Sequence, residues 1–306
     1  MFDPNDECAL LSRRTMLAGG ISLGIAGSMA GSTSAAAAFA EPPVPNQLLR
    51  ERGIPTDTAS RVALMRRMRL RTDAGPVFWY FRGRNYAQQG ANLIPICELV
   101  FGAVMLVTPN RDGTLDVVQY ELGFRSPLGS AKRTDQLLNP ITGEMIDLPF
   151  APVGPTHIKY DTNNTLELPE NIGGSSFSLE HVPEVFYRVG DTVSFQTHSR
   201  AIVKTPGQND RVLNDMSMIS SPDKEALDPD VACASAVAYG GDVTDYARWL
   251  KMPPGAGTQT LRSVGEKVTR YSDMPEDWRM MLAESDPVMA ADPIAGLSRE
   301  AAVYRN

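Results

Sequence analysis

One segment of the chain places tyrosine and arginine at every second position, the spacing that puts side chains on one face of a β-strand. Tyr80, Arg82, Arg84 and Tyr86 alternate there with Trp79, Phe81 and Gly83. Two guanidinium groups flanked by two phenol rings can bind a negatively charged aromatic ligand through hydrogen bonds and cation–π contacts. The alternative is that the arginine stems merely cover aromatic rings at the edge of a barrel. We predict Tyr80, Arg82 and Tyr86 as ligand-binding residues.

A second alternating segment, residues 192–203, carries His198 and Arg200 on one face. If that face lines a lumen shared with Tyr80 and Arg82, His198 is placed to act as an acid or base and Arg200 to hold an anion or a carbonyl group. If it lies on the outside of the protein, both side chains are simply hydrated. The catalytic prediction is therefore His198 with Arg200, and Tyr187 of the preceding strand completes the predicted ligand-binding set.

Most other catalytic patterns are missing from the sequence. It contains no G-x-S-x-G, no P-loop, no H-E-x-x-H and no G-x-G-x-x-G after a strand. His157, His181 and His198 are the only histidines, and no two stand at a chelating spacing. We therefore expect neither a metal nor a cofactor.

Composition indicates a folded globular protein and limits its partners. The 306 residues are 42% apolar and 21% charged, with a formal net charge of −7. Affinity for nucleic acid or anionic lipid needs an excess of Lys and Arg, so neither partner is expected. The oligomeric state is left open.

The N-terminal residues are typical of an export signal. Arg13-Arg14 precedes an uncharged, glycine-containing run over 16–30, and Ala38-Phe39-Ala40 follows. We predict a twin-arginine signal over residues 1–40 that engages the twin-arginine export machinery and is cleaved before Glu41. An apolar run of about 15 residues is shorter than the roughly 20 of a membrane-spanning helix, so no membrane attachment is expected after cleavage. This predicts a periplasmic protein.

Two cysteines, Cys97 and Cys233, remain after the predicted cleavage. The periplasm permits a disulfide between them. Buried thiols that behave as small apolar groups are the alternative, and the sequence leaves both open.

The remaining periodicity indicates an all-β protein. We expect a linker and N-terminal helix over 41–75, with the helix at 46–70, and a single β-rich domain over 76–306. Two hairpin turns are predicted at Asp112-Gly113 and Gly190-Asp191. The predicted strands are 77–86, 99–108, 115–124, 184–189, 192–203, 213–220, 232–239 and 259–269, and the predicted short helices are 243–251 and 275–284. Together they favour an antiparallel barrel or sandwich of about 8–10 strands with a few short helices.

Four segments resemble the bacterial family known as domain of unknown function 1838. They are Gly83-Arg84-Asn85-Tyr86, Asn139-Pro140-Ile141-Thr142-Gly143-Glu144, Trp249-Leu250-Lys251-Met252 with Pro254-Gly255, and Gly265-Glu266-Lys267 with Met274-Pro275. The family often has a His and an Asn-Asp-Pro-Val after the second segment, and residues 148–153 carry neither. The resemblance implies export and a β-rich fold, and it brings no established activity.

The first functional hypothesis is an exported β-barrel that binds a small apolar or aromatic molecule. Such a protein could act on its ligand by acid/base chemistry, as an isomerase or lyase without metal or nucleotide. The alternatives are a non-catalytic periplasmic binding protein and a structural or interaction protein of the cell envelope. The sequence does not decide whether the chain is an enzyme.

Overall fold

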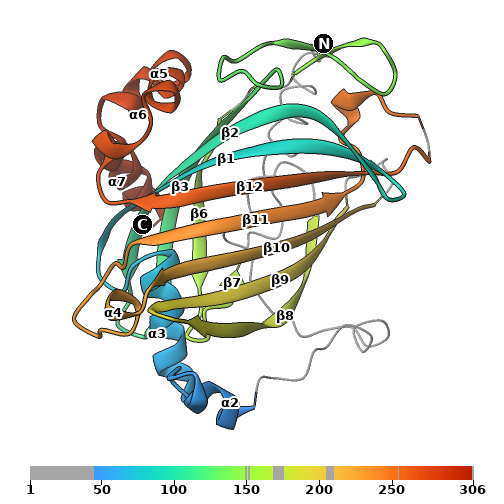
Figure 1. Ribbon diagram of the computed structural model, residues 1–306. Helices are drawn as coiled ribbons and strands as arrows, with labels where there is room; N and C mark the ends of the chain where they lie inside the picture. Colours follow the sequence, from blue (N-terminus) through green and yellow to red (C-terminus); the bar gives the residue numbers. More distant parts are fainter. Residues whose placement is uncertain are drawn as a thin grey trace.

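A computed structural model describes residues 45–148, 150, 152–167, 176–204, 210–253 and 255–304 (Figure 1). The predicted signal peptide lies outside these residues. Ten strands form one antiparallel sheet in the order β7-β6-β3-β2-β1-β12-β11-β10-β9-β8. The strands of this sheet are β1 (Gly75–Gln89), β2 (Asn92–Pro109), β3 (Leu115–Ser126), β6 (Val153–Tyr160), β7 (Leu166–Glu167), β8 (Ser176–Val189), β9 (Thr192–Lys204), β10 (Arg211–Pro222), β11 (Ala236–Thr244) and β12 (Thr258–Val268). The expected β-rich, barrel-like class is confirmed.

The two predicted hairpin turns join neighbouring strands of this sheet. Gly113, between β2 and β3, has a φ of 84°, and Gly190, between β8 and β9, has a φ of 60°. Both values lie in the left-handed region, which glycine enters without steric cost. The carboxylate of Asp112 also accepts the backbone N–H of Thr114 at 3.0 Å, which closes the first turn.

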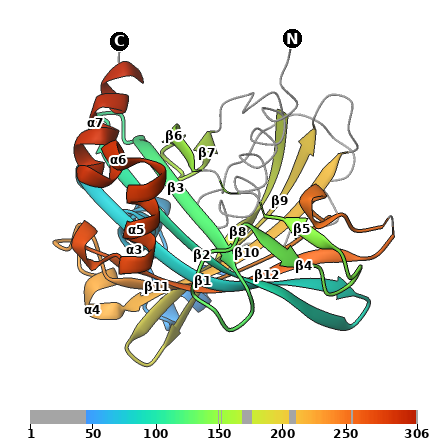
Figure 2. The same cartoon turned by 90° about the horizontal axis from the view of Figure 1, so that it is seen from above.

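The sheet curls so that one face becomes an interior. A single core cluster joins Tyr160 and Leu166, near one edge of the sheet, with Phe186 and Phe195 near the other edge. Trp79, in the central strand β1, belongs to the same cluster. Side chains from opposite edges can share one core only if the sheet bends around it, as Figure 2 shows from above.

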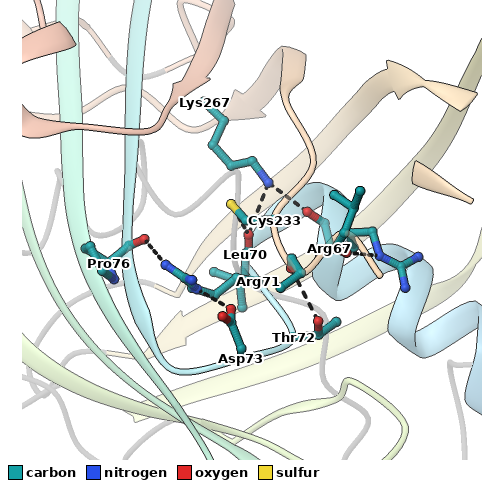
Figure 3. A network of polar contacts seen from close by, with 10 residues as sticks. Arg67, Leu70, Arg71, Thr72, Asp73, Pro76, Cys233 and Lys267 are labelled. Carbon is teal, nitrogen blue, oxygen red and sulfur yellow. Dashed lines mark hydrogen bonds and ion pairs between the residues drawn. The ribbon is translucent and has the colours of Figure 1, made fainter. Parts of the chain in front are cut away.

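Helix α3 (Thr58–Arg69) packs against this inward face, after the short helix α2 (Asn46–Glu51). The carboxylate of Asp57 begins α3 by accepting the N–H of Ser60 at 2.8 Å. At the other end, Lys267 of β12 donates from Nζ to the carbonyl oxygens of Arg67 at 2.7 Å and Leu70 at 3.1 Å (Figure 3). This contact satisfies carbonyl groups that a helix end leaves without intrahelical partners. Burial lowers the pKa of Lys267 to about 8.

The opposite, outward face of β1, β2 and β3 is covered by C-terminal helices that the sequence analysis only partly predicted. Trp278 of α5 donates its indole N–H to the carbonyl oxygen of Leu122 at 2.9 Å. A methyl group at Gly102 would lie 2.5 Å from the Trp278 ring, so this close approach needs glycine. The helices are α5 (Glu276–Ser285), α6 (Pro287–Ala291) and α7 (Pro293–Tyr304).

Two of the four segments that carry the family resemblance meet at one end of the sheet, through Asn139 of one and Leu250 of the other. Asn139 is fully buried, and its side-chain amide donates to the carbonyl oxygen of Leu250 at 2.7 Å. Arg125 stacks on the ring of Trp249, with 4.6 Å between the guanidinium carbon and the ring centroid. The elements here are the hairpin of β4 (Gln136–Leu138) and β5 (Met145–Asp147) and the 3-10 helix η3 (Arg248–Leu250). The Asn-Pro turn thus has a packing role.

Several predicted elements differ from the observed ones. The single helix expected over 46–70 is interrupted after α2, where Gly53 has a φ of 66° and Pro55 follows. The helix expected over 243–251 is wrong, because β11 continues through Thr244 and only η3 follows. The remaining short helices are α4 (Asp223–Ala226) and η4 (Tyr271–Asp273).

Cys97 and Cys233 are free thiols, Cys97 buried and Cys233 partly exposed. Within the described part of the chain, no helix has both the length and the apolar character needed to cross a membrane.

Candidate functional site

The strand register puts the two predicted polar sets on the same face of the sheet. His198 pairs with Met216, which pairs with Gly241, then Arg262 and finally Arg84. His198 and Arg200 therefore share a face with Arg84 and Arg82. The prediction that they lie on one face agrees with this register.

The prediction that this face lines a lumen is wrong. The residues of β9 that face the interior are those that alternate with His198 and Arg200. Among them, Val193, Phe195, Thr197 and Ser199 are all buried. The apolar members of this set pack in the interior cluster with α3. The physical reason is that burial favours the face with the larger apolar area. His198 is half-buried on the outward face.

The outward arginines mostly form local ion pairs. Arg200 reaches Glu180, its cross-strand neighbour, at 3.1 Å, and Arg84 reaches Glu98 at 2.5 Å. Tyr187 lies under the guanidinium of Arg52, 5.3 Å from its ring centroid. Tyr187 lies on β8, at the far edge of the sheet from β1, so it cannot share a site with Tyr80.

Tyr80 and Arg82 do line a hollow, on the outside of β1, β10, β11 and β12. Its volume is about 480 Å³, within the range of small-molecule sites. Its lining residues are Tyr80, Arg82, Met218, Ser220, Val237, Ala238, Tyr239, Val264, Gly265 and Glu266. Neither His198, Arg200, Tyr86 nor Tyr187 belongs to this lining.

The charged part of this hollow is already engaged. The guanidinium of Arg82 lies 5.5 Å from the ring centroid of Tyr80 and forms an ion pair with Asp277 of α5 at 2.5 Å. Burial, with the charge of Asp277, raises the pKa of Tyr80 to about 12. The hollow therefore offers apolar surface and one half-exposed arginine whose charge is already paired.

A different group of polar residues faces the interior, and the sequence analysis did not identify it. Arg69, at the end of α3, is only 3% exposed. Its guanidinium carbon lies 5.2 Å from the ring centroid of Phe195, and its Nε and Nη1 have no hydrogen-bond partner among the described residues. No ion pair within the described part of the chain includes Arg69.

One wall beside Arg69 is formed by β3 and β6. Glu121 accepts a hydrogen bond from Gln119 at 3.2 Å through Oε1, while Oε2 has no partner among the described residues. Burial raises the pKa of Glu121 to about 8. Burial also raises the pKa of Tyr160, which Arg69 lowers and Glu121 raises, so the three groups interact electrostatically.

The opposite wall is formed by β9, β10 and β11. Asp215 and Asp242 are direct cross-strand neighbours, and Ser199 pairs with Asp215 from the other side. Burial and the charge of Asp242 raise the pKa of Asp215 well above its usual range, against the opposing effect of Arg69. Its Oδ1 has no partner within the described residues. Asp242 Oδ1 accepts the N–H of Leu261 at 2.9 Å.

These groups form what we call the inward site: Arg69, Glu121, Tyr160, Asp215 and Asp242. A carboxyl group with a pKa near 8 is mostly protonated at neutral pH and can donate a proton or a hydrogen bond. A guanidinium always donates. The site therefore combines a permanent cation with weak acids in a buried setting. These are the groups that acid/base chemistry on a small molecule requires.

Only weak signals in the sequence pointed to these residues. Glu121 stands in a strand of mostly apolar residues, and Asp215 stands between Leu213 and Met216 in another. An acidic residue at an inward position of a strand is unusual. Nothing local indicates that Arg69 of a distant helix lies between them. No three described His, Cys, Asp or Glu side chains gather in a way that could hold a metal ion.

No family model and no curated protein matches the chain. Solved structures with some similarity include the crystal structure of Neisserial surface protein A, at 8% identity and a TM-score of 0.25, covering 64% of this chain and 99% of that chain. A triple mutant of the Rhodopseudomonas blastica porin has 8% identity and a TM-score of 0.18, covering 63% of this chain and 99% of that chain. Superpositions of this quality carry no argument about fold, location or function.

Proposed function

We propose that the protein binds a small molecule against the inward face of its curled sheet, at the inward site. The observation that supports this most is a set of buried polar atoms on Arg69, Glu121 and Asp215 that have no hydrogen-bond partner among the described residues. Buried polar groups in folded proteins are nearly always hydrogen-bonded, because an unmet donor or acceptor costs about 1–3 kcal/mol. A bound ligand supplies the missing partners.

If the protein is an enzyme, its chemistry is acid/base catalysis of the isomerase or lyase type. Glu121 then acts as the acid, because it still holds its proton at neutral pH and faces the interior. The carboxyl pair of Asp215 and Asp242 is the corresponding candidate for a base on the other wall. These residues take the role that the sequence analysis assigned to His198 and Arg200.

We also propose that the chain is a member of the domain of unknown function 1838 family and is exported to the periplasm by the twin-arginine route. The support is the resemblance of the quoted segments and the Arg13-Arg14 pattern. Replacing both arginines by lysine should abolish the periplasmic form that begins at Glu41. Undiminished periplasmic protein after that replacement would exclude this export route.

The second candidate is a binding protein without catalysis that uses the outward hollow of Tyr80 and Arg82. The observation that favours it is the hollow's volume of about 480 Å³ with exposed apolar side chains, of which Val264 is 61% and Val237 57% exposed. An apolar surface of this kind often marks an interaction site.

Native mass spectrometry of the protein purified from the periplasm separates the two candidates. The variants Arg69→Met and Arg82→Met each remove one guanidinium while keeping a long apolar side chain, the first inside and the second outside. Binding at the inward site predicts that a co-purifying molecule is lost in Arg69→Met and retained in Arg82→Met. Loss of the molecule in Arg82→Met and its retention in Arg69→Met would instead identify the outward hollow as the binding site.

A further inference from the structure

The balance of charges and donors in the inward site contains information about its ligand. Arg69 carries a permanent positive charge, is 3% exposed and forms no ion pair with a described residue. Burying a cation without a partner is strongly unfavourable, because hydration is lost and nothing replaces it. The interior therefore needs an anion near Arg69.

Two of the three neighbouring carboxyl groups, Glu121 and Asp215, do not supply that anion, and Oδ1 of the third, Asp242, already accepts the N–H of Leu261. Glu121 is mostly protonated at neutral pH, and burial drives Asp215 toward its protonated form as well. A protonated carboxyl group presents an O–H donor. Protonated Glu121 and Asp215 thus present hydrogen-bond donors beside those of the Arg69 guanidinium. A ligand group that fits among these donors is rich in hydrogen-bond acceptors.

The walls limit what the anion is attached to. Phe195 lies under the Arg69 guanidinium, and Phe186 packs beside it with 6.1 Å between ring centroids. On β1, Trp79 stacks on Phe81 at 5.5 Å, and its indole N–H is bonded to the carbonyl oxygen of Arg69 at 2.9 Å. Aromatic rings at both the guanidinium and the backbone of Arg69 favour a ligand with an apolar or aromatic body.

We propose that the ligand of the inward site is a small organic carboxylate, with its carboxylate group held by Arg69 and its apolar body against Phe195 and Trp79. This inference rests on the proposed function, since it names the ligand class of the same site. The single guanidinium of Arg69, which forms no ion pair with a described residue, matches the single charge of a carboxylate. A phosphate monoester, with nearly two charges at neutral pH, would leave negative charge unmatched.

The test compares three probes with one skeleton on the mature protein by isothermal titration calorimetry. Phenylacetate carries a negative charge, phenylacetamide is neutral and 2-phenylethylamine is positive. We expect phenylacetate to bind at least tenfold more tightly than the amide, because the carboxylate offers Arg69 two acceptor oxygens and a countercharge, whereas the amide offers one carbonyl acceptor and no charge. The positively charged amine should bind least.

The matched variants are Arg69→Met and Arg84→Met, which remove an inward and an outward guanidinium. Arg69→Met should weaken phenylacetate binding by about ten- to a hundredfold, the usual effect of losing a charged hydrogen bond. It should leave the amide nearly unaffected, and Arg84→Met should change neither. Circular dichroism identifies a variant that fails to fold.

A second measurement does not require a change at Arg69. The charged and titratable groups around it are Glu121 on β3, Tyr160 on β6, Asp215 on β10 and Asp242 on β11, with Arg66 on α3 itself. Phenylacetate affinity should fall as the pH rises from 7 to 9, because ionised Glu121 repels the carboxylate. Glu121→Gln should remove most of that fall.

The outcomes separate the inference from the proposed function. Equal binding of the three probes, with loss in Arg69→Met, would keep the inward site but overturn the carboxylate assignment. Phenylacetate binding that is unchanged in both Arg69→Met and Glu121→Gln would overturn the carboxylate assignment and show that phenylacetate binds outside the inward site. No binding of any probe, together with no co-purified molecule, would overturn both proposals.

Discussion

Glu121 should make the protein less stable as the pH rises through the neutral range. An unfolded glutamate ionises near its usual pKa of 4.5, whereas in the folded protein burial raises the pKa of Glu121 to about 8. Between these values the folded state holds about one more proton than the unfolded state. The free energy of unfolding should therefore fall by about 1.4 kcal/mol per pH unit, or about 5 kcal/mol in total. The contribution is complete below pH 4.5 and lost by pH 8.

Urea denaturation of the wild type and of Glu121→Gln at pH 5, 6, 7 and 8 measures this effect. The glutamine amide cannot ionise, so the free energy of unfolding of Glu121→Gln should lack the slope that Glu121 causes. The stability of the variant relative to the wild type should therefore increase steadily as the pH rises. Asp215 lowers the free energy of unfolding with rising pH in both proteins, so its effect cancels in the difference between the wild type and Glu121→Gln. Glu266→Gln, which removes an exposed carboxyl group on the outward face of β12, is the matched control. Parallel curves for the wild type and Glu121→Gln between pH 5 and 8 would refute the reasoning.

Three further substitutions test the packing that positions the inward site. Lys267→Met should lower the free energy of unfolding by about 1–3 kcal/mol, because two carbonyl groups at the end of α3 lose their charged donor and keep only the weaker donors of Ala234 and Cys233, and chemical denaturation at pH 7 should detect this loss. Gly102→Ala should cost about 1–3 kcal/mol, because the new methyl group would lie 2.5 Å from the Trp278 ring; unchanged near-ultraviolet circular dichroism and an unchanged denaturation midpoint would argue against that contact. Asn139→Ala should cost about 1–2 kcal/mol through loss of the buried hydrogen bond to Leu250, and limited proteolysis should then cut near η3 faster than in the wild type.

The closeness of Arg69 to Asp215 depends on where α3 ends. The carbonyl groups of the last turn are held by Lys267, while the indole of Trp79 holds the carbonyl group of Arg69 itself. These contacts fix the backbone from which the guanidinium projects toward Phe195. Loss of Lys267 should therefore weaken ligand binding as well as stability.

The sequence by itself determined the local structure of most strands. Alternating side chains over 192–203 and the Gly190-Asp191 turn predicted β9 to within a residue and its turn correctly, because a two-residue period and a positive φ are properties of the local chain. The partner strand β8 begins at Ser176, eight residues before the predicted start at 184. Where the local helix pattern disagreed with strand pairing in the sheet, strand pairing determined the structure. Val243 and Thr244 extend β11, since they pair with Asn214 and Leu213 of β10, and the predicted helix there does not form.

Only the tertiary structure decided which face of each strand is the interior. Alternation over 192–203 defines two faces, and the larger apolar area favours burial of the face that carries Thr197. Only the curling of the sheet around α3 made that face an interior. The inward site has the same origin. Arg69, Glu121 and Asp215 lie in three elements far apart in the sequence. The raised pKa values of Glu121 and Asp215 arise mainly from burial, which depends on the packing of the whole sheet rather than on neighbouring residues.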